Sequence, residues 1–410
     1  MTCAFPKPIR TFQDPVTGVT MHQLTDGDEP SVHMYFTACS WTQDGRYLIV
    51  LRRVKGAWNY FIVGVDGNWR QLTHYPPTQH PRRYLKHMHR AFFAEEVERM
   101  LWRIPAMHLT QPMLVFAWKN ALHQLNLETG DDEIIYQFTE AESQQPKTNL
   151  HTEFTADGRD LILVTNRETV PNEPRLDPPE QAWNMKLRDE SGIVSTIWRF
   201  DFERRALDGP LFRSNGEQAH PLTCPWNPDL IVWTQYLHSC FYLLRRDGSE
   251  VRRPLDLPNH MLGHYNWDTA NRRLTFIDTD WGAQSSRLGS LDIETGEVRW
   301  FECVHHDASQ WHQSPSPDGR WIVMDQPSFL IGGVNGLSLV DQQRDVQLPL
   351  CQLNCSWSTG LRDDDGQPIK SETLHPNPSW SPDGRYVLVD SDFGTGISQV
   401  YAVDMATWRP

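Results

Sequence analysis

The sequence predicts an all-β fold, a seven-bladed β-propeller, and two repeated patterns lead to this prediction. A turn with Asp-Gly-Arg at its end occurs at residues 40–46, 316–320 and 379–385, and each copy leads into a short apolar strand. A second pattern recurs between these copies. It is a strand that reaches an Asp or Asn and then a turn that contains Gly, as at residues 125–130 and 291–296. A period of roughly 40–50 residues with four short strands per unit is typical of a propeller blade.

The repeats place the blades, in order, at about residues 31–75, 88–140, 150–215, 219–256, 262–304, 310–350 and 373–410. The last blade has only three predicted strands, whereas residues 14–25 resemble the end of a blade. We therefore expect this N-terminal strand to join the C-terminal blade and close the ring, which removes both sheet edges. The whole chain, residues 1–410, is then a single propeller domain.

Two polar segments interrupt the repeats. Residues 170–189 are rich in proline and too long for a plain turn, and residues 359–371 form a similar, shorter insertion. Segments of this length between strands are commonly functional loops. We expect the first to lie over one face of the ring as a substrate lid.

The composition argues against several classes of protein. A net charge of −14 disfavours nucleic acid as a partner, and no run of about 18 apolar residues is available for a membrane span. The first eight residues lack the apolar core of a signal peptide. The seven cysteines are scattered, without a CxxC pair, which fits reduced thiols in a cytoplasmic protein. The sequence does not indicate an oligomeric state.

Histidines lead the innermost strand of nearly every predicted blade. Innermost strands lie nearest the axis, so their leading residues face one central channel although they are far apart in the sequence. These leaders are His87, His89, His151, His220, His264, His312 and His375. The set indicates a functional pocket, while for any single member a hydrogen-bonded core or rim residue stays an alternative.

Part of this set has the chemistry of a metal site. Clustered neutral imidazoles suit a transition metal, and carboxylate or amide oxygens can complete its shell. The best such shell combines His312 and His375 with Glu372 and Asn377. Because alternate residues of an extended strand share a side, positions 375 and 377 can face the same ion. We therefore expect a divalent metal cofactor.

Arginines near the predicted pocket indicate an acidic ligand. Arg167 follows the inner strand of blade 3, and Arg52 and Arg53 follow that of blade 1. A guanidinium binds a carboxylate through two parallel hydrogen bonds. A surface or structural ion pair stays the alternative for each. We expect Arg53, with His151 and His220, to contact substrate.

These residues bring the chain to a known family. Over essentially its whole length it resembles the oligogalacturonate lyases of polysaccharide lyase family 22, seven-bladed propellers that cleave short pectin fragments in bacterial cytoplasm. The stretches that carry the resemblance are Trp-Asn-Tyr at 58–60, Gln-Leu-Thr at 71–73, Arg167-Glu168, His220-Pro221, His264, His312 and His375-Pro376.

The resemblance implies roles for these residues. The family holds manganese with a blade-6 histidine and a Gln-x-x-His-x-His run, so His312 and His375 match two ligands of Mn²⁺. A blade-5 base of the family matches His264. Arg167 would assist the metal in neutralising the carboxylate of the substrate. The chain departs from the family at Glu372 in place of Gln and at Asn377 in place of His. The implied reaction is metal-assisted β-elimination on acidic, uronate-containing oligosaccharides.

A further departure keeps other functions open. An arginine that the family places in a blade-4 strand aligns with Cys240, so substrate recognition can differ from that of a strict pectin enzyme. One alternative is therefore a lyase acting on a different uronate oligosaccharide. The other is a non-catalytic propeller that serves as a binding scaffold, against which the axial histidines argue.

Overall fold

The computed structural model describes most of the chain. The residues that it does not describe are 1–2, 4, 43, 78–82, 86–89, 93–103, 119–120, 140–151, 169–192, 216–217, 236–239, 258–259, 281, 308–310, 327–335, 354, 356–374 and 410. Every regular element within the described part is a β-strand. Among these residues no helix combines the length and apolarity that crossing a bilayer requires.

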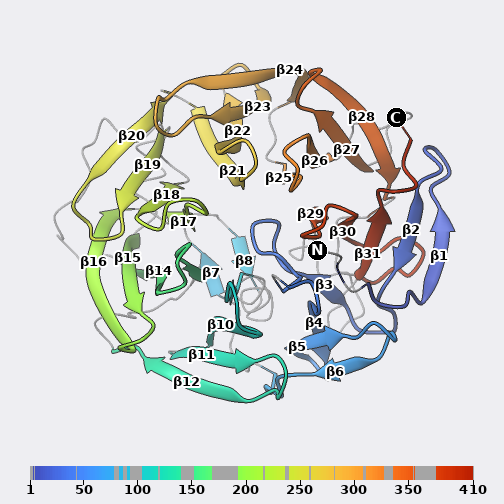
Figure 1. Cartoon of the computed structure of the whole chain (residues 1–410), viewed down its shortest axis with the longest axis horizontal. Coiled ribbons are helices and arrows are strands. Elements are labelled where there is room, and N and C mark those ends of the chain that lie inside the picture. Colours follow the sequence, from blue (N-terminus) through green and yellow to red (C-terminus); the bar gives the residue numbers. More distant parts are fainter. Residues whose placement is uncertain are drawn as a thin grey trace.

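The predicted all-β, seven-bladed propeller is confirmed. Seven antiparallel sheets surround an axis (Figure 1), and in each the strands follow one another outward from the centre. Blade 1 consists of β3 (Ser31–His33), β4 (Leu48–Val54), β5 (Ala57–Val63) and β6 (Trp69–Gln71). Blade 2 consists of β9 (Ala106–Met107), β10 (Met113–Trp118), β11 (Ala121–Asn126) and β12 (Asp132–Gln137). Blade 3 consists of β13 (Thr152–Phe154), β14 (Asp160–Glu168), β15 (Ile193–Asp201) and β16 (Ala206–Asn215).

The remaining blades repeat this pattern. Blade 4 consists of β17 (Gln218–Thr223), β18 (Leu230–Gln235), β19 (Cys240–Arg245) and β20 (Val251–Asp256). Blade 5 consists of β21 (His260–Asp268), β22 (Arg273–Asp280), β23 (Ser285–Leu291) and β24 (Val298–Asp307). Blade 6 consists of β25 (Gln313–Pro315), β26 (Trp321–Gln326), β27 (Gly336–Asp341) and β28 (Val346–Gln352). Blade 7 contains β29 (Ser379–Trp380), β30 (Tyr386–Ser391) and β31 (Gln399–Asp404).

The N-terminal strand closes the ring, as the sequence predicts. Strand β2 (Thr20–Gln23) pairs antiparallel with β31, and Thr20 stands opposite Asp404. A further strand, β1 (Arg10–Gln13), pairs with β2 and makes blade 7 five-stranded. The fifth strand was not predicted. It covers the edge of β2, so the chain's first and last strands lie within one sheet.

The predicted start of blade 2 is wrong. Its innermost strand is β9, which begins at Ala106 rather than near residue 88. The preceding segment contains a separate two-stranded hairpin, β7 (Arg83–Leu85) and β8 (Arg90–Phe92). His87 and His89 therefore do not lead the inner strand of this blade, and they lie outside the described residues, as do both predicted loops at 170–189 and 359–371.

The recurring Asp-Gly-Arg turn has a local physical cause. In blade 6 the Ser316 hydroxyl donates to Asp318 at 2.6 Å and accepts the N–H of Trp321 at 2.9 Å, while Gly319 takes a φ of +69°. Glycine adopts this left-handed conformation without steric cost. In blade 7, Ser381 donates to Asp383 in the same way. Each motif thus fixes the hairpin that feeds the second strand of its blade.

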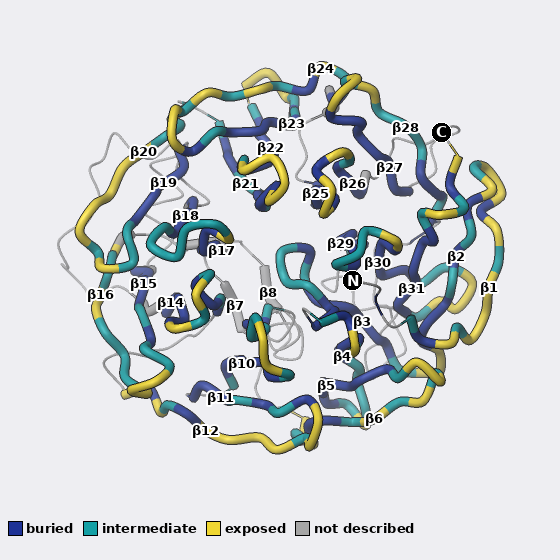
Figure 2. Tube along the Cα trace, in the orientation of Figure 1, coloured by how far each residue is buried: buried dark blue, intermediate teal, exposed yellow. Residues whose placement is uncertain are grey.

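Apolar side chains between neighbouring blades form the core. Val323 and Leu339 of blade 6 pack with Val387 and Tyr401 of blade 7 in one buried cluster. The outermost strands are the most exposed, and the middle strands are buried (Figure 2). Burying one such side chain contributes roughly 1.5–3 kcal/mol, so the sheet faces hold the ring together.

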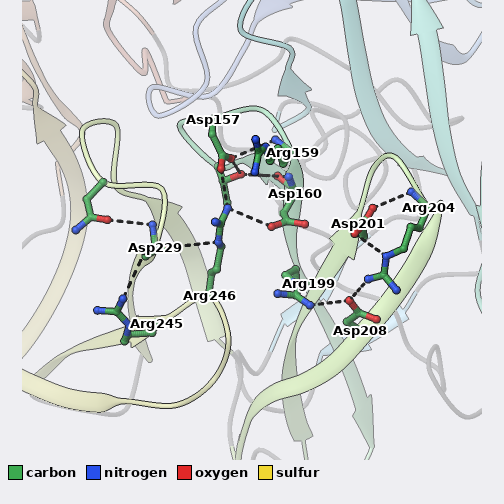
Figure 3. A network of polar contacts seen from close by, with 12 residues as sticks. Asp157, Arg159, Asp160, Arg199, Asp201, Arg204, Asp208, Asp229, Arg245 and Arg246 are labelled. Atoms are coloured by element: carbon green, nitrogen blue, oxygen red, sulfur yellow. Dashed lines mark hydrogen bonds and ion pairs between the residues drawn. The ribbon is translucent and has the colours of Figure 1, made fainter.

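Ion pairs add to the contact between blades 3 and 4. Arg246 follows β19 of blade 4, and its guanidinium lies 2.8 Å from Asp157 of blade 3 and 2.9 Å from Asp229 of its own blade. Asp160 lies 3.4 Å from the same guanidinium (Figure 3). The neighbouring Arg245 makes only a longer, more exposed pair with Asp229, at 3.6 Å. Arg246 is therefore the cation that links the two sheets.

Candidate metal centre and active site

Three of the predicted histidines lie together. His264 is in β21, while His312 precedes β25 and His375 precedes β29. The ring centroids of His264 and His312 are 4.3 Å apart, and those of His312 and His375 are 4.9 Å apart. Blades 5, 6 and 7 each contribute one ring, because their innermost strands are neighbours around the axis (Figure 1). We call these three residues the histidine cluster.

One buried carboxylate organises the cluster. Asp325, on β26, accepts the backbone N–H of His312 at 2.7 Å and a ring hydrogen bond from His312 Nδ1 at 2.9 Å. It also accepts the backbone N–H of Asn377 at 3.1 Å. Burial raises the pKa of Asp325, and the nearby His375 opposes that rise. Because Nδ1 of His312 is engaged, Nε2 is the nitrogen that can bind a metal.

Asn377 is held in an unusual conformation beside the cluster. Its φ is +51°, and its side-chain N–H group donates to the carbonyl of His375 at 2.7 Å. His33 of blade 1 donates from Nε2 to the carbonyl of Asn377 at 2.7 Å, and its Nδ1 lies 2.8 Å from Asp390. Non-glycine residues with positive φ concentrate at functional sites, and asparagine tolerates this region better than most.

His264 is also strained. Its φ is +42°, and the pairing of β21 with β22 shifts register between Gly263 and Asn266, which is the mark of a β-bulge. The carbonyl of His264 accepts a hydrogen bond from Gln313 at 3.0 Å. Bulges next to functional sites re-aim side chains. Here the bulge turns His264 toward the ring of His312.

An aromatic loop from blade 1 packs against the cluster. Between β3 and β4 the chain reaches toward the axis (Figure 1), and it carries Tyr35 and Phe36. The ring of Phe36 lies 5.1 Å from that of His312 and 5.9 Å from that of His264. Tyr35 lies 5.5 Å from His312. The imidazoles thus have apolar surface on one side, which limits the access of water.

Among the remaining residues of the predicted site, the structure describes the side chain of Arg53. Arg53 is in β4, and its guanidinium pairs with Glu29 at 3.0 Å. Arg167 lies in β14 and His220 in β17, but their side chains are outside the described part. His151 and Glu372 also lie outside it. The roles of these residues stay predictions.

Cys240, the position aligned with a family arginine, is buried in the core. Its side chain is 1% exposed and packs with Ile231 and Trp233 between blades 3 and 4. Burial raises the pKa of its thiol to about 11. A charged guanidinium at this position would lose its water without reaching the axial channel. The residue therefore serves packing.

Three of the four predicted metal ligands are described, and their chemistry fits a divalent ion. No group of three His, Cys, Asp or Glu side chains able to hold an ion occurs among the described residues, but the predicted set consists of two imidazoles, one amide and Glu372. The Oδ1 atom of Asn377 is buried and has no hydrogen-bond partner, as a metal ligand requires. Two nitrogen and two oxygen donors suit a borderline ion such as Mn²⁺.

The sequence reasoning missed the residues that support the cluster. Asp278, Asp325 and Asp390 occupy the same position of the second strand in blades 5, 6 and 7, each at the end of an apolar run. Asp278 lies 2.8 Å from Nδ1 of His260, so each of the three pairs with a histidine. A carboxylate repeated within buried strands was the available signal, because such groups are rarely buried without a partner.

Comparisons with known proteins agree with this architecture. No protein-family model matches the sequence. The chain is 22% identical over 392 residues to oligogalacturonate lyase of Dickeya dadantii (strain 3937), and the match covers 93% of this chain and 92% of that protein. A solved oligogalacturonate lyase in complex with manganese has a TM-score of 0.73 at 20% identity, with coverage of 99% and 98%. The oligogalacturonate lyase of Vibrio parahaemolyticus has a TM-score of 0.70 at 18% identity, with 97% of both chains covered.

The fold defines the chain as a seven-bladed β-propeller whose architecture is similar to that of the solved oligogalacturonate lyases. The resemblance predicted from the sequence is confirmed, because the likeness extends over nearly all of both chains. The chain is similar over nearly its whole length, at 22% identity, to the Dickeya dadantii oligogalacturonate lyase.

Proposed function

We propose that this protein is a lyase that cleaves acidic, uronate-containing oligosaccharides by metal-assisted β-elimination. The observation that supports it best is the histidine cluster of a propeller related to oligogalacturonate lyase. The ring centroids of His264 and His312 are 4.3 Å apart, and those of His312 and His375 are 4.9 Å apart. A fold alone does not imply an activity, so the proposed activity depends on this site.

The cluster contains the donors that would hold the cofactor. His312 through Nε2, His375, the Oδ1 of Asn377 and Glu372 form the proposed ligand set, and Asp325 fixes the ring of His312. A bound divalent ion would neutralise the carboxylate of the uronate and so stabilise the negative charge that develops when the C5 proton leaves. We propose that this divalent ion is Mn²⁺.

His264 would carry the proton transfer. Its imidazole takes the C5 proton, the C5–H electron pair forms the C4–C5 double bond, and the bond from C4 to the departing sugar oxygen breaks. The protonated imidazole or water then supplies the proton for that oxygen, so no water is added overall. Imidazole suits this role because its pKa lies near neutral pH. Arg167 would pair with the substrate carboxylate.

The proposal can be tested by the product that it requires. Purified protein is mixed with oligogalacturonate fragments and Mn²⁺, and the ultraviolet absorbance of the unsaturated uronate is followed. We expect absorbance to rise, and to stop rising when a chelator is added. A parallel panel of other acidic oligosaccharides identifies a changed substrate, which the departures at Glu372 and Asn377 favour.

The scaffold alternative makes the opposite prediction. A non-catalytic propeller would contain no stoichiometric metal and would generate no absorbance with any member of the panel. Elemental analysis of the purified protein separates the two functions even if the right oligosaccharide is missing from the panel.

A further inference from the structure

A groove lies between blades 6 and 7, at the turns that follow their innermost strands. Its volume is about 400 Å³, which is within the range of ligand sites. It is bounded by residues 316–318 and Trp321 of blade 6, by Trp380 and residues 382–384 of blade 7, and by Met405 and Trp408. His312 and His375 precede β25 and β29, whereas these turns follow the same strands, so the groove and the histidine cluster lie at opposite ends of the innermost strands. We call it the blade 6–7 groove.

The boundary between blades 7 and 1 is built from the same parts. The sequence Ser-Pro-Asp-Gly-Arg occurs in both blade 6 (residues 316–320) and blade 7 (residues 381–385), and an aromatic residue follows each copy. Because every blade repeats one structural unit, Asp383 stands at the blade 7–1 boundary where Asp318 stands at the blade 6–7 boundary. The two boundaries can therefore be compared atom by atom.

The chain's own N-terminal segment occupies the groove between blades 7 and 1. The backbone N–H of Cys3 donates to Oδ2 of Asp383 at 2.8 Å. The ring of Phe5 stacks on that of Tyr386, the aromatic residue after the motif, with 3.9 Å between the centroids. On the blade 1 side, Cys3 approaches Gly45 so closely that a Cβ at this glycine would lie 3.0 Å from it. This groove therefore accepts a segment of main chain, and the aspartate of the motif is its acceptor.

The blade 6–7 groove is only partly filled by the described residues. Trp408 packs edge-on against Trp321, with 5.2 Å between the ring centroids, and so covers the aromatic residue of the motif. No described residue takes the place that Cys3 has at the other boundary. At Gly384, apart from its neighbours in the chain, the described atom nearest to where a Cβ would lie belongs to Pro317, 3.7 Å away. The corresponding space is part of the cavity.

Asp318 has a hydrogen-bond acceptor that its own turn does not use. Its Oδ1 accepts the hydroxyl of Ser316 at 2.6 Å and the backbone N–H of Arg320 at 3.1 Å. Its Oδ2 makes no hydrogen bond or ion pair with any described residue, whereas Oδ2 of Asp383 accepts the N–H of Cys3. Asp318 is exposed and lines the groove, so a ligand can reach it.

The walls of the blade 6–7 groove favour a hydrogen-bond donor. Asp318 and Asp383 both line it, and among the described residues no Lys, Arg or His does so. The guanidinium of Arg320 lies over the ring of Trp321, 4.7 Å from its centroid, and 3.6 Å from Asp341. Carboxylates accept hydrogen bonds strongly and repel anions, so an N–H group of an uncharged or basic segment complements this lining.

We propose that the blade 6–7 groove binds a segment of a partner protein, whose backbone N–H donates to Oδ2 of Asp318 and whose uncharged side chain packs against Trp380. Its main chain passes close to Gly384. Cys3 makes the same contacts one blade further on, where it packs with Trp41 in a buried cluster. A separate protein is the partner rather than a second copy of this chain, because the second copy would have to withdraw its N-terminal segment from its own groove. The site is independent of the proposed lyase reaction.

Peptides that differ at one position test the proposal. The probe is acetyl-Thr-Ser-Ala-Lys-amide, which follows the sequence around Cys3 with serine in place of the thiol. A dye on the lysine reports its binding to the full-length protein through fluorescence anisotropy, and we expect saturable binding. N-methylation of the serine nitrogen removes the donor and should weaken binding about tenfold or more, because a hydrogen bond to a charged group is lost. Aspartate in place of the serine should abolish binding, since it would lie beside two carboxylates.

Variants connect the result to named atoms. Asp318→Asn keeps one oxygen for the turn and replaces Oδ2 by a donor, so it should weaken binding of the probe about tenfold. Asp44→Asn is the matched control, because Asp44 has the same place in the blade 1 turn but its carboxylate already pairs with Arg46 at 2.5 Å; binding should not change. Phe5→Ala loosens the chain's own segment in the neighbouring groove and should also leave binding unchanged.

Four outcomes would overturn the inference. Absence of saturable binding would show that the groove does not accept a peptide. Equal binding of the N-methylated probe would mean that no N–H group reaches Asp318. Undiminished binding to a folded Asp318→Asn variant would place the peptide elsewhere on the protein. Tighter binding to Phe5→Ala would place it in the groove between blades 7 and 1, where that variant frees space.

Discussion

Asp325 holds His312 at two points, since its carboxylate accepts both the backbone N–H and the ring Nδ1 of that residue, at 2.7 and 2.9 Å. The imidazole therefore has a fixed orientation before any ion arrives. The same carboxylate also accepts the N–H of Asn377, so one side chain sets the positions of two proposed ligands from different blades. Partners of this kind raise metal affinity because they remove the cost of ordering the ligands.

Asp325→Asn should weaken Mn²⁺ binding about 10–100-fold. Asparagine carries no negative charge. Its one carbonyl oxygen cannot replace both carboxylate oxygens, which accept the hydrogen bonds from His312 and Asn377. Calorimetric titration of the metal-free protein measures the change. Asp278→Asn removes the equivalent carboxylate of blade 5, which pairs with His260 and Arg287, and it should leave metal affinity intact. Equal losses in both variants would point to general destabilisation instead.

His264→Ala should lower the rate of elimination about 10²–10⁴-fold, because it removes the proposed base. Mn²⁺ affinity should stay within a few-fold of the parent protein, since His264 is not among the proposed ligands. The exposed His74 provides a control, and His74→Ala should retain full activity. Retained activity in His264→Ala would reject the assignment of the base.

Arg246→Met should destabilise the protein by about 1–3 kcal/mol, measured by urea unfolding. The substitution leaves three aspartates near one another without their shared cation. Arg245→Met, which breaks only a longer and more exposed pair, should change the free energy of unfolding by less than about 0.5 kcal/mol. Similar effects of the two variants would show that Arg246 does not link blades 3 and 4.

Glu153→Gln should alter the pH dependence of stability. Burial raises the folded-state pKa of Glu153 from 4.5 to about 8. Between these values the folded protein keeps a proton that the unfolded chain releases, so the free energy of unfolding falls as pH rises. Glutamine does not titrate. Relative to the parent, the variant should gain stability from pH 5 to pH 8, by on the order of 3 kcal/mol.

Urea unfolding of both proteins at several pH values measures that gain. Glu133→Gln is the control, because pairing with Arg205 lowers the pKa of Glu133 and leaves it ionised in both states over this range. A difference between Glu153→Gln and the parent that stays constant from pH 5 to pH 8 would contradict the prediction.

The seven-bladed ring can be predicted from the sequence because the motifs that mark its blades are local. The Ser-to-Asp hydrogen bond and the positive φ of Gly319 belong to a five-residue motif, so each copy forms the same turn wherever it occurs. The start of blade 2 could not be found in this way. Strand β9 has only two residues and lacks the motif, and a hairpin precedes it.

The site was only partly predictable, since its details depend on contacts between distant segments. The positions of His264, His312 and His375 follow from the repeat. The bond from His33 to the carbonyl of Asn377 crosses from blade 1 to blade 7, and no local pattern indicates it. The positive φ of His264 and Asn377 likewise depends on neighbours, because neither residue type requires that conformation.

The pairing of β2 with β31 has a consequence for how the protein is made. Strand β2 is translated well before its partner β31, because the two strands lie far apart in the sequence. Blades 6 and 7, which carry His312 and His375, are translated after blades 1 to 5. A nascent chain therefore has no complete proposed metal centre, and a product that stops before β31 would lack both the closing strand pair and the blade-7 framework that the proposed chemistry needs.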